Sequence, residues 1–284
     1  MNIFGRKITT KAALLFVIAY ITCLSSLASA QVSIAPTALF FDNQNRFQSL
    51  TISNGGQQAQ EISITSKFAY AASRNGNLVF VKDSTLAKKK SISNWIKVFP
   101  KNFTLQAQER QIVRFVVRPP NNLETGGYWA RVQIQSNPVS PPIESVAEDQ
   151  VGAQINLVVN QIINAFYHTP NAQTIISAPS VSFTQVDSTD TGTVSLSMEQ
   201  TGDAPFVGSI SFSLVDQEGN TVYQTRATTS VFTSLTRNFT IDLTDVKPGQ
   251  YQISGRIISE RRDISQENLL QIEPVNFEKK VLIE

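Results

Sequence analysis

The stretch Val151–Pro170, VGAQINLVVNQIINAFYHTP, alternates apolar and polar side chains over much of its length. Successive side chains of a strand point to opposite sides, so one face of this stretch carries Ala153, Ile155, Leu157 and Val159. The other face is mostly polar and is interrupted by Val158. Two interpretations remain open. The stretch is either a sandwich strand with one face in its own core, or an edge strand whose apolar row is inserted into another protein.

The first thirty residues have the features of a secretory signal peptide. Arg6, Lys7 and Lys11 give a positive start, an apolar run follows over residues 12–24, and Ala28-Ser29-Ala30 supplies a small-residue cleavage site. We therefore predict that residues 1–30 are removed and that the protein is exported to the periplasm. Cys23 follows Tyr20-Ile21-Thr22, a poor lipoprotein site, so the sequence favours cleavage before Gln31 over lipidation.

Composition limits the functions open to the mature chain. Residues 31–284 contain no cysteine, so packing alone must hold the exported protein together. The whole chain has a formal charge of +2, and three of its positive residues lie in the signal peptide. Nucleic acid is therefore not an expected partner. No later segment approaches the length of a membrane span.

Short β-rich runs separated by turn residues fill the mature chain, and helical periodicity is scarce. In the first half we predict strands near Val32–Phe41, Phe47–Ser53, Gln60–Phe68, Trp95–Phe99, Arg110–Arg118, Tyr128–Gln135 and Val151–Tyr167. Asn54-Gly55-Gly56 and Thr125-Gly126-Gly127 indicate turns. Seven strands at this spacing predict an immunoglobulin-like sandwich over residues 31–169.

The second half repeats the pattern over residues 170–284. Its predicted strands lie near Ser180–Val186, Thr193–Glu199, Gly208–Val215, Thr221–Thr228, Arg237–Leu243, Tyr251–Ser259 and Val275–Ile283. Asp216–Asn220 reads as a hairpin turn. The fold class is therefore all-β, with two immunoglobulin-like sandwiches in tandem.

Each half carries a tyrosine shortly after a glycine turn, at the start of its penultimate strand. These residues are Tyr128 and Tyr251. A tyrosine at this corner of a sandwich often donates its hydroxyl hydrogen to the backbone a few residues upstream. We assign both a structural role.

The residues needed for catalysis are scarce. His168 is the single histidine, and no Gly-x-Ser-x-Gly elbow accompanies it. Asp187, Asp190 and Asp203 lie in Ser/Thr/Gly-rich loops, where turn formation is their usual role. We therefore predict no enzymatic activity, no cofactor and no metal site.

Three stretches of the first half resemble the N-terminal domain of the PapD-like periplasmic pilus-assembly chaperones. They are VSIAPTALFFDNQNRFQSLTISN, WIKVFPKNFTLQAQERQIVRFVVRPP, and GGYWARVQIQSNP followed by VGAQINLVVNQIINAFYHTP. The resemblance covers about residues 32–170, and the second half matches the family only in its layout.

The resemblance implies that the last strand of the first domain completes a pilus subunit whose sandwich lacks a strand. The implied subunit-binding positions are Ala153, Ile155, Leu157 and Val159. Classical members also hold the subunit's terminal carboxylate with an Arg and a Lys. Ala38 and Asn164 occupy these two positions here, so the basic residues are missing and Asn164 is left as a neutral chain-end anchor.

Two hypotheses follow. The first is a divergent periplasmic chaperone that caps pilus or surface-fibre subunits, with an outer-membrane assembly platform as a further partner. The alternative is a structural or adhesive module of the cell envelope, which requires Ile155, Leu157 and Val159 to be buried in their own domain. An exposed apolar edge would also permit self-association through the same strand.

Overall fold

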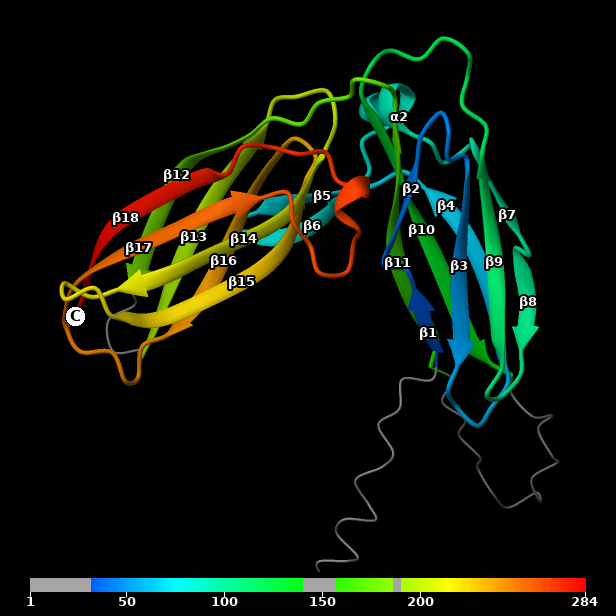
Figure 1. The fold of residues 1–284 in the computed structure, drawn as a ribbon. Helices are drawn as coiled ribbons and strands as arrows, with labels where there is room; N and C mark the ends of the chain where they lie inside the picture. The colour runs from blue at the N-terminus through cyan, green and yellow to red at the C-terminus, as the bar shows by residue number, and fades with distance from the viewer. Residues whose placement is uncertain (1–31, 140–156, 186–189) are drawn as a thin grey trace, which may run out of the picture.

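A computed structural model describes residues 32–139, 157–185 and 190–284. These residues form two β-sandwiches in tandem, which confirms the predicted all-β fold (Figure 1). Each sandwich closes around its own cluster of buried apolar side chains. In the described part of the chain, no helix is long and apolar enough to span a membrane.

The first sandwich packs a four-stranded sheet of order β1-β3-β9-β7 against a five-stranded sheet of order β2-β11-β10-β4-β8. The strands are β1 (Val32–Ala35), β2 (Ala38–Phe41), β3 (Phe47–Asn54), β4 (Gln60–Lys67), β7 (Ile96–Phe99), β8 (Asn102–Leu105), β9 (Arg110–Val117), β10 (Gly127–Pro138) and β11 (Val159–His168). The core side chains include Leu50, Phe115 and Tyr167.

The single strand predicted over Val32–Phe41 is wrong, because the chain changes sheet within it. β1 pairs with β3 in one sheet, and β2 pairs with β11 in the other. Pro36 lies at the crossing and has no N–H to offer to either ladder. One short segment therefore contributes an edge strand to both sheets.

Asn54, at the end of β3, fastens the neighbouring turns. Its side chain is buried, and its Nδ2 donates to the carbonyl oxygens of Gln58, Leu105 and Gln106. Its Oδ1 accepts from the N–H of Gly56. This amide supplies the hydrogen bonds that backbone pairing does not, where the β3–β4 and β8–β9 turns meet.

The second sandwich packs a three-stranded sheet, β12-β13-β16, against a four-stranded sheet, β15-β14-β17-β18. Its strands are β12 (Ile176–Gln185), β13 (Thr191–Gln200), β14 (Phe206–Val215), β15 (Thr221–Val231), β16 (Ser234–Asp242), β17 (Gly249–Ile258) and β18 (Val275–Ile283). All seven strands predicted for this half are present. A 3₁₀ turn, η2 (Gln266–Asn268), lies between β17 and β18.

Both tyrosine corners are confirmed. Tyr128 donates its hydroxyl hydrogen to the carbonyl oxygen of Glu124, at 2.9 Å. Tyr251 donates to the carbonyl oxygen of Lys247, at 2.8 Å. The two sandwiches thus fix the turn before their penultimate strand in the same way.

A hairpin and a short helix, neither of them predicted, leave the first sandwich after β4. The hairpin pairs β5 (Tyr70–Arg74) with β6 (Asn77–Val81), and α2 (Ser84–Lys90) follows it. Asn75 and Gly76 form the hairpin tip, both with positive φ. A Cβ on Gly76 would lie 2.1 Å from the Asn238 side chain, so this tip lies close against β16 of the second sandwich.

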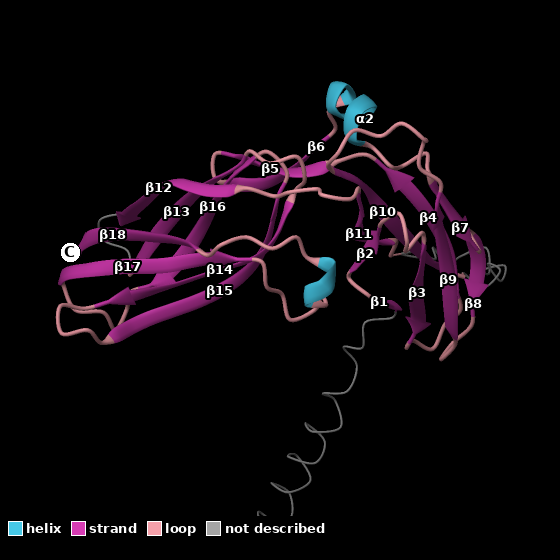
Figure 2. Ribbon diagram, turned by 45° about the horizontal axis from the view of Figure 1, so that its top comes forward, coloured by secondary structure: helices cyan, strands magenta, loops and turns pink. Residues whose placement is uncertain are grey.

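A buried apolar cluster joins the two sandwiches. It includes Trp129 and Phe166 from the first half and Phe232 from the second, with the Trp129 and Phe232 ring centroids 5.0 Å apart. Hydrogen bonds cross the same joint, among them the Gly127 N–H to the Asp203 carbonyl at 3.0 Å. Figure 2 shows the two sandwiches meeting at one end at an angle, with the cyan turn η2 on the side of the joint.

Candidate functional site

The predicted subunit-binding row falls only partly within the described residues. Ala153 and Ile155 lie outside them. Leu157 lies two residues before Val159, the first residue of β11; its side chain is 69% exposed, while Val159 is half-buried. The predicted strand over Val151–Tyr167 therefore begins, in the described part, at Val159.

Strand β11 is covered on one edge but only half covered on the other. β10 pairs with it along its whole length, from Val159 to His168. On the other edge β2 pairs with it in parallel, and only over Asn164–Tyr167. Among the described residues no strand pairs with this second edge over Val159–Ile163, so its backbone groups there remain available to another strand.

The two faces of β11 have different roles. Ile163, Ala165 and Tyr167 point into the core of the first sandwich. By strand alternation Gln161, Val159 and Leu157 follow on this same side toward the end of the sandwich, and Gln161 donates from its Nε2 to the Val32 carbonyl at 2.7 Å. The apolar side chains of Leu157 and Val159 therefore lie in line with the core row but are separated from it by the polar Gln161.

Asn164 lies in a row of register partners that crosses four strands. It pairs with Ala38 of β2 on one side and with Arg131 of β10 on the other, and Arg131 pairs with Lys67 of β4. The two positions where classical chaperones carry basic residues are thus adjacent here, and a cation lies one strand further on. Sequence reasoning missed Arg131, although its place in the strand after Tyr128 was available from strand alternation.

Arg131 has a buried polar atom with no partner. Its Nε is buried without a hydrogen bond, and no ion pair to this residue occurs in the described part of the chain. The guanidinium carbon lies 4.0 Å from the centroid of the Phe80 ring. Burial lowers the pKa of Arg131, but an arginine remains cationic in proteins. The site therefore holds a desolvated positive charge and an unused donor.

A small cleft of about 170 Å³ opens beside Arg131 between the two sandwiches. Leu78 and Phe80 of the β5–β6 hairpin line one part of it, and residues of β15 and β16 line another. The lining residue Thr229 is buried and its hydroxyl has no partner. The other cleft arginines are engaged: Arg237 donates to the Thr228 carbonyl, and Arg261 pairs with Asp263.

His168 is not placed for catalysis. Burial lowers its pKa to about 4, and its ring lies near those of Phe40 and Phe166. Its Nε2 is buried without a partner. Within the described ranges, no group of histidine, cysteine or acidic side chains is arranged to hold a metal.

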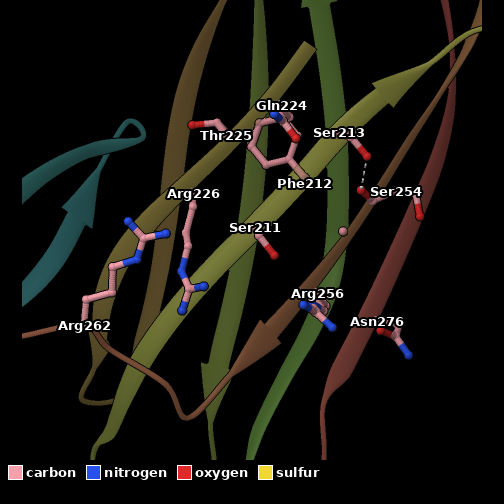
Figure 3. Close-up of a pocket in the computed structure, with 11 residues that line it drawn as sticks. Ser211, Phe212, Ser213, Gln224, Thr225, Arg226, Ser254, Arg256, Arg262 and Asn276 are labelled. Carbon is pink, nitrogen blue, oxygen red and sulfur yellow. Dashed lines mark hydrogen bonds between the residues drawn. The ribbon is translucent and has the colours of Figure 1, made fainter. Parts of the chain in front are cut away.

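A broader hollow lies on the outer face of the second sandwich (Figure 3). One row of register partners crosses it, composed of Arg226, Ser211, Arg256 and Asn276. Arg226 is paired with Glu260 at 2.9 Å. The lining is polar and carries neither a carboxylate nor a histidine, so it supplies no acid–base pair.

Comparisons with known proteins give structural likenesses alone. No protein-family model matches the sequence, and no curated protein matches it. Similar solved structures include the YadV chaperone, at 8% identity and a TM-score of 0.44 over 88% of this chain and 100% of that chain. A chain of the CsuC–CsuE chaperone–tip adhesion subunit complex of Acinetobacter baumannii is 14% identical, with a TM-score of 0.45 over 87% and 98% of the two chains. The Salmonella enterica SafA pilin–SafB chaperone complex gives 13% identity and a TM-score of 0.41 over 87% and 95%.

Proposed function

We propose that this protein is a periplasmic chaperone that caps fibre subunits by pairing the open edge of β11 with a strand of the subunit. The observation that carries the proposal is the half-covered edge: among the described residues, no strand pairs with one side of Val159–Ile163. A partner strand added there would satisfy the open backbone groups. The stretch from Ala153 to Val159 would supply the side chains that enter the partner's groove.

The apolar row gives this addition its affinity. Leu157 is 69% exposed in the isolated chain, and beyond the polar Gln161 its row continues into core residues. A subunit whose incomplete sandwich has an open groove would bury these apolar side chains in that groove. The core of the first sandwich would then continue into the core of the subunit. Full burial of a leucine side chain contributes about 1.5–3 kcal/mol before the costs of ordering. The exposure of Leu157 also counts against the alternative of a self-contained structural module, which requires that side chain to be buried.

The cleft provides the second part of the proposed site. A subunit strand paired along β11 would run toward Asn164, where β2 begins to cover the edge. Asn164 can donate a neutral hydrogen bond to a chain-end carboxylate, and Arg131 in the same row adds the missing positive charge. We therefore assign chain-end anchoring to Asn164 together with Arg131.

The test is co-purification of the tagged protein from the periplasm of its own host, followed by mass spectrometry of any stoichiometric companion. We expect a companion with an incomplete β-sandwich. Leu157→Arg should weaken its binding at least about 100-fold, because a charge would replace an apolar contact worth about 3 kcal/mol. Leu282→Arg is the matched control, because Leu282 is 57% exposed on β18 of the other sandwich.

Retention of the companion by a folded Leu157→Arg protein would contradict strand donation. Equal losses in Leu157→Arg and Leu282→Arg would show that a general surface effect, rather than β11, governs the interaction.

A further inference from the structure

The outer face of the β1-β3-β9-β7 sheet has an unusual pattern of side chains. Along β9 the outward positions read Arg110, Ile112, Arg114 and Val116, while the residues between them point inward and Phe115 lies in the core. Cations and apolar groups therefore alternate along one exposed strand, about 7 Å apart. We call this surface the β9 face.

Two aromatic side chains flank this row. Phe47 of β3 is 74% exposed and Phe99 of β7 is 64% exposed. Register places Val116 between Phe47 and Lys97, and Arg114 between Ser49 and Phe99. Phe99 therefore lies beside Arg114 in the sheet, and Phe47 lies one row away from Arg114. Other aromatics of the two packed sheets, such as Phe115 and Tyr167, are buried, and the further exposed phenyl ring of the first half, Phe80, lies on the β5–β6 hairpin.

The β9 face carries positive charge without compensation. Lys97, Arg110 and Arg114 are exposed, and the four strands contain no aspartate or glutamate. The ion pairs found in the described residues lie elsewhere, in the second half of the chain. A ligand of the face must therefore bring negative charge along with apolar groups.

Within the described residues, the second sandwich does not pack on the β9 face. The joint to the second sandwich is made by Trp129 and Phe166, which belong to the opposite sheet. In Figure 1 strands β3, β9 and β7 lie on the side of the first sandwich that faces away from the second. The second sandwich therefore does not cover the β9 face.

We propose that the β9 face docks on an anionic lipid surface. Exposed phenyl rings enter the boundary between headgroups and acyl chains, while arginine and lysine pair with headgroup phosphates. The alternation of cationic and apolar side chains suits a lipid surface, because the negative charge of the headgroups is spread evenly above the apolar acyl chains. Several neighbouring outward residues of β1 and β3 are small, including Ser33, Ala35 and Ser49. No large side chain at these positions would prevent the sheet from approaching the lipid surface. This inference does not depend on strand donation by β11.

The experiment is flotation of the purified protein with mixed phosphatidylethanolamine–phosphatidylglycerol vesicles and with phosphatidylcholine vesicles. We expect flotation with the anionic vesicles only, and a decrease as salt is raised. The double variant Phe47→Ser/Phe99→Ser and the double variant Arg110→Ser/Arg114→Ser should each reduce binding at least about tenfold. Leu282→Ser, an exposed apolar change on the second sandwich, should bind like the wild type.

Absence of flotation with the anionic vesicles would overturn the proposal, as would flotation of both double variants at the wild-type level. A photo-crosslink from position 47 or 99 to an envelope protein, together with no vesicle binding, would also overturn it and would assign the β9 face to a protein partner. Binding of the companion subunit, measured with the same variants, should be unchanged whichever result is found.

Discussion

Replacing Arg131 by methionine should stabilise the free protein while weakening its complex. Methionine keeps the apolar stem but removes a guanidinium whose Nε is buried without a partner. An unsatisfied buried donor costs about 1–3 kcal/mol, and the contact with the Phe80 ring returns about 0.5–2 kcal/mol. The difference leaves a net gain of about 1 kcal/mol for Arg131→Met.

Arg237→Met is the matched control. Its guanidinium donates to the Thr228 carbonyl at 2.7 Å and lies 5.2 Å from the Phe239 ring centroid. Loss of a charged hydrogen bond costs about 1.5–3 kcal/mol. The two substitutions are alike in chemistry, so we expect opposite signs of the stability change.

Urea unfolding followed by circular dichroism measures both effects. A change of 1 kcal/mol moves the midpoint by about 0.3–1 M at usual slopes. A fall in stability for Arg131→Met as large as that for Arg237→Met would refute the view that Arg131 is kept for a partner. Undiminished binding of the companion by Arg131→Met would refute its role in the chain-end site.

Three further outcomes are expected. Asn54→Ala should lower the free energy of unfolding by about 2–3 kcal/mol, because three buried or part-buried carbonyls lose their donor. Tyr128→Phe and Tyr251→Phe should each cost about 1 kcal/mol without loss of fold, as measured by thermal unfolding. The pKa of His168 is about 4 in the folded protein, below the value of 6.5 in the unfolded chain. The free energy of unfolding should therefore be unaffected by this residue above pH 6.5 and should fall by about 3 kcal/mol as the pH is lowered from 6.5 to 4. Urea midpoints should show this slope, and it should be absent in a folded His168→Gln protein. The carboxyl of Asp263, whose pKa its hydrogen bond from Arg261 lowers to about 2, should affect stability only below that window.

Strand alternation and turn residues predicted most of the sandwich strands, because those signals are local. The break at Pro36 could also have been predicted, since proline cannot donate within a continuous ladder. The β5–β6 hairpin had a signal of its own, Asn75-Gly76, a dipeptide typical of two-residue hairpin turns. Its contact with β16 had none, because that contact depends on the angle between the two sandwiches.

The candidate site was only partly predictable for the same reason. Leu157 and Val159 could be chosen by their spacing, and Asn164 by its position in the resemblance. Arg131 could not be ranked above the chain's other arginines from the sequence, because its distinction is a buried Nε beneath Phe80. That environment exists only after the hairpin has folded back over β10. The exposure of Phe47 and Phe99 likewise depends on which face of their sheet is left uncovered.

Amide hydrogen exchange of β11, with and without the companion subunit, tests strand donation most directly. In the free protein, the amides of Val159–Ile163 that do not bond to β10 should exchange quickly, while those of Asn164–Tyr167 should be protected by β10 and β2. Binding should slow exchange at Val159–Ile163 at least about tenfold and leave Asn164–Tyr167 unchanged. Full protection of Val159–Ile163 in the free protein, or no change on binding, would contradict the account.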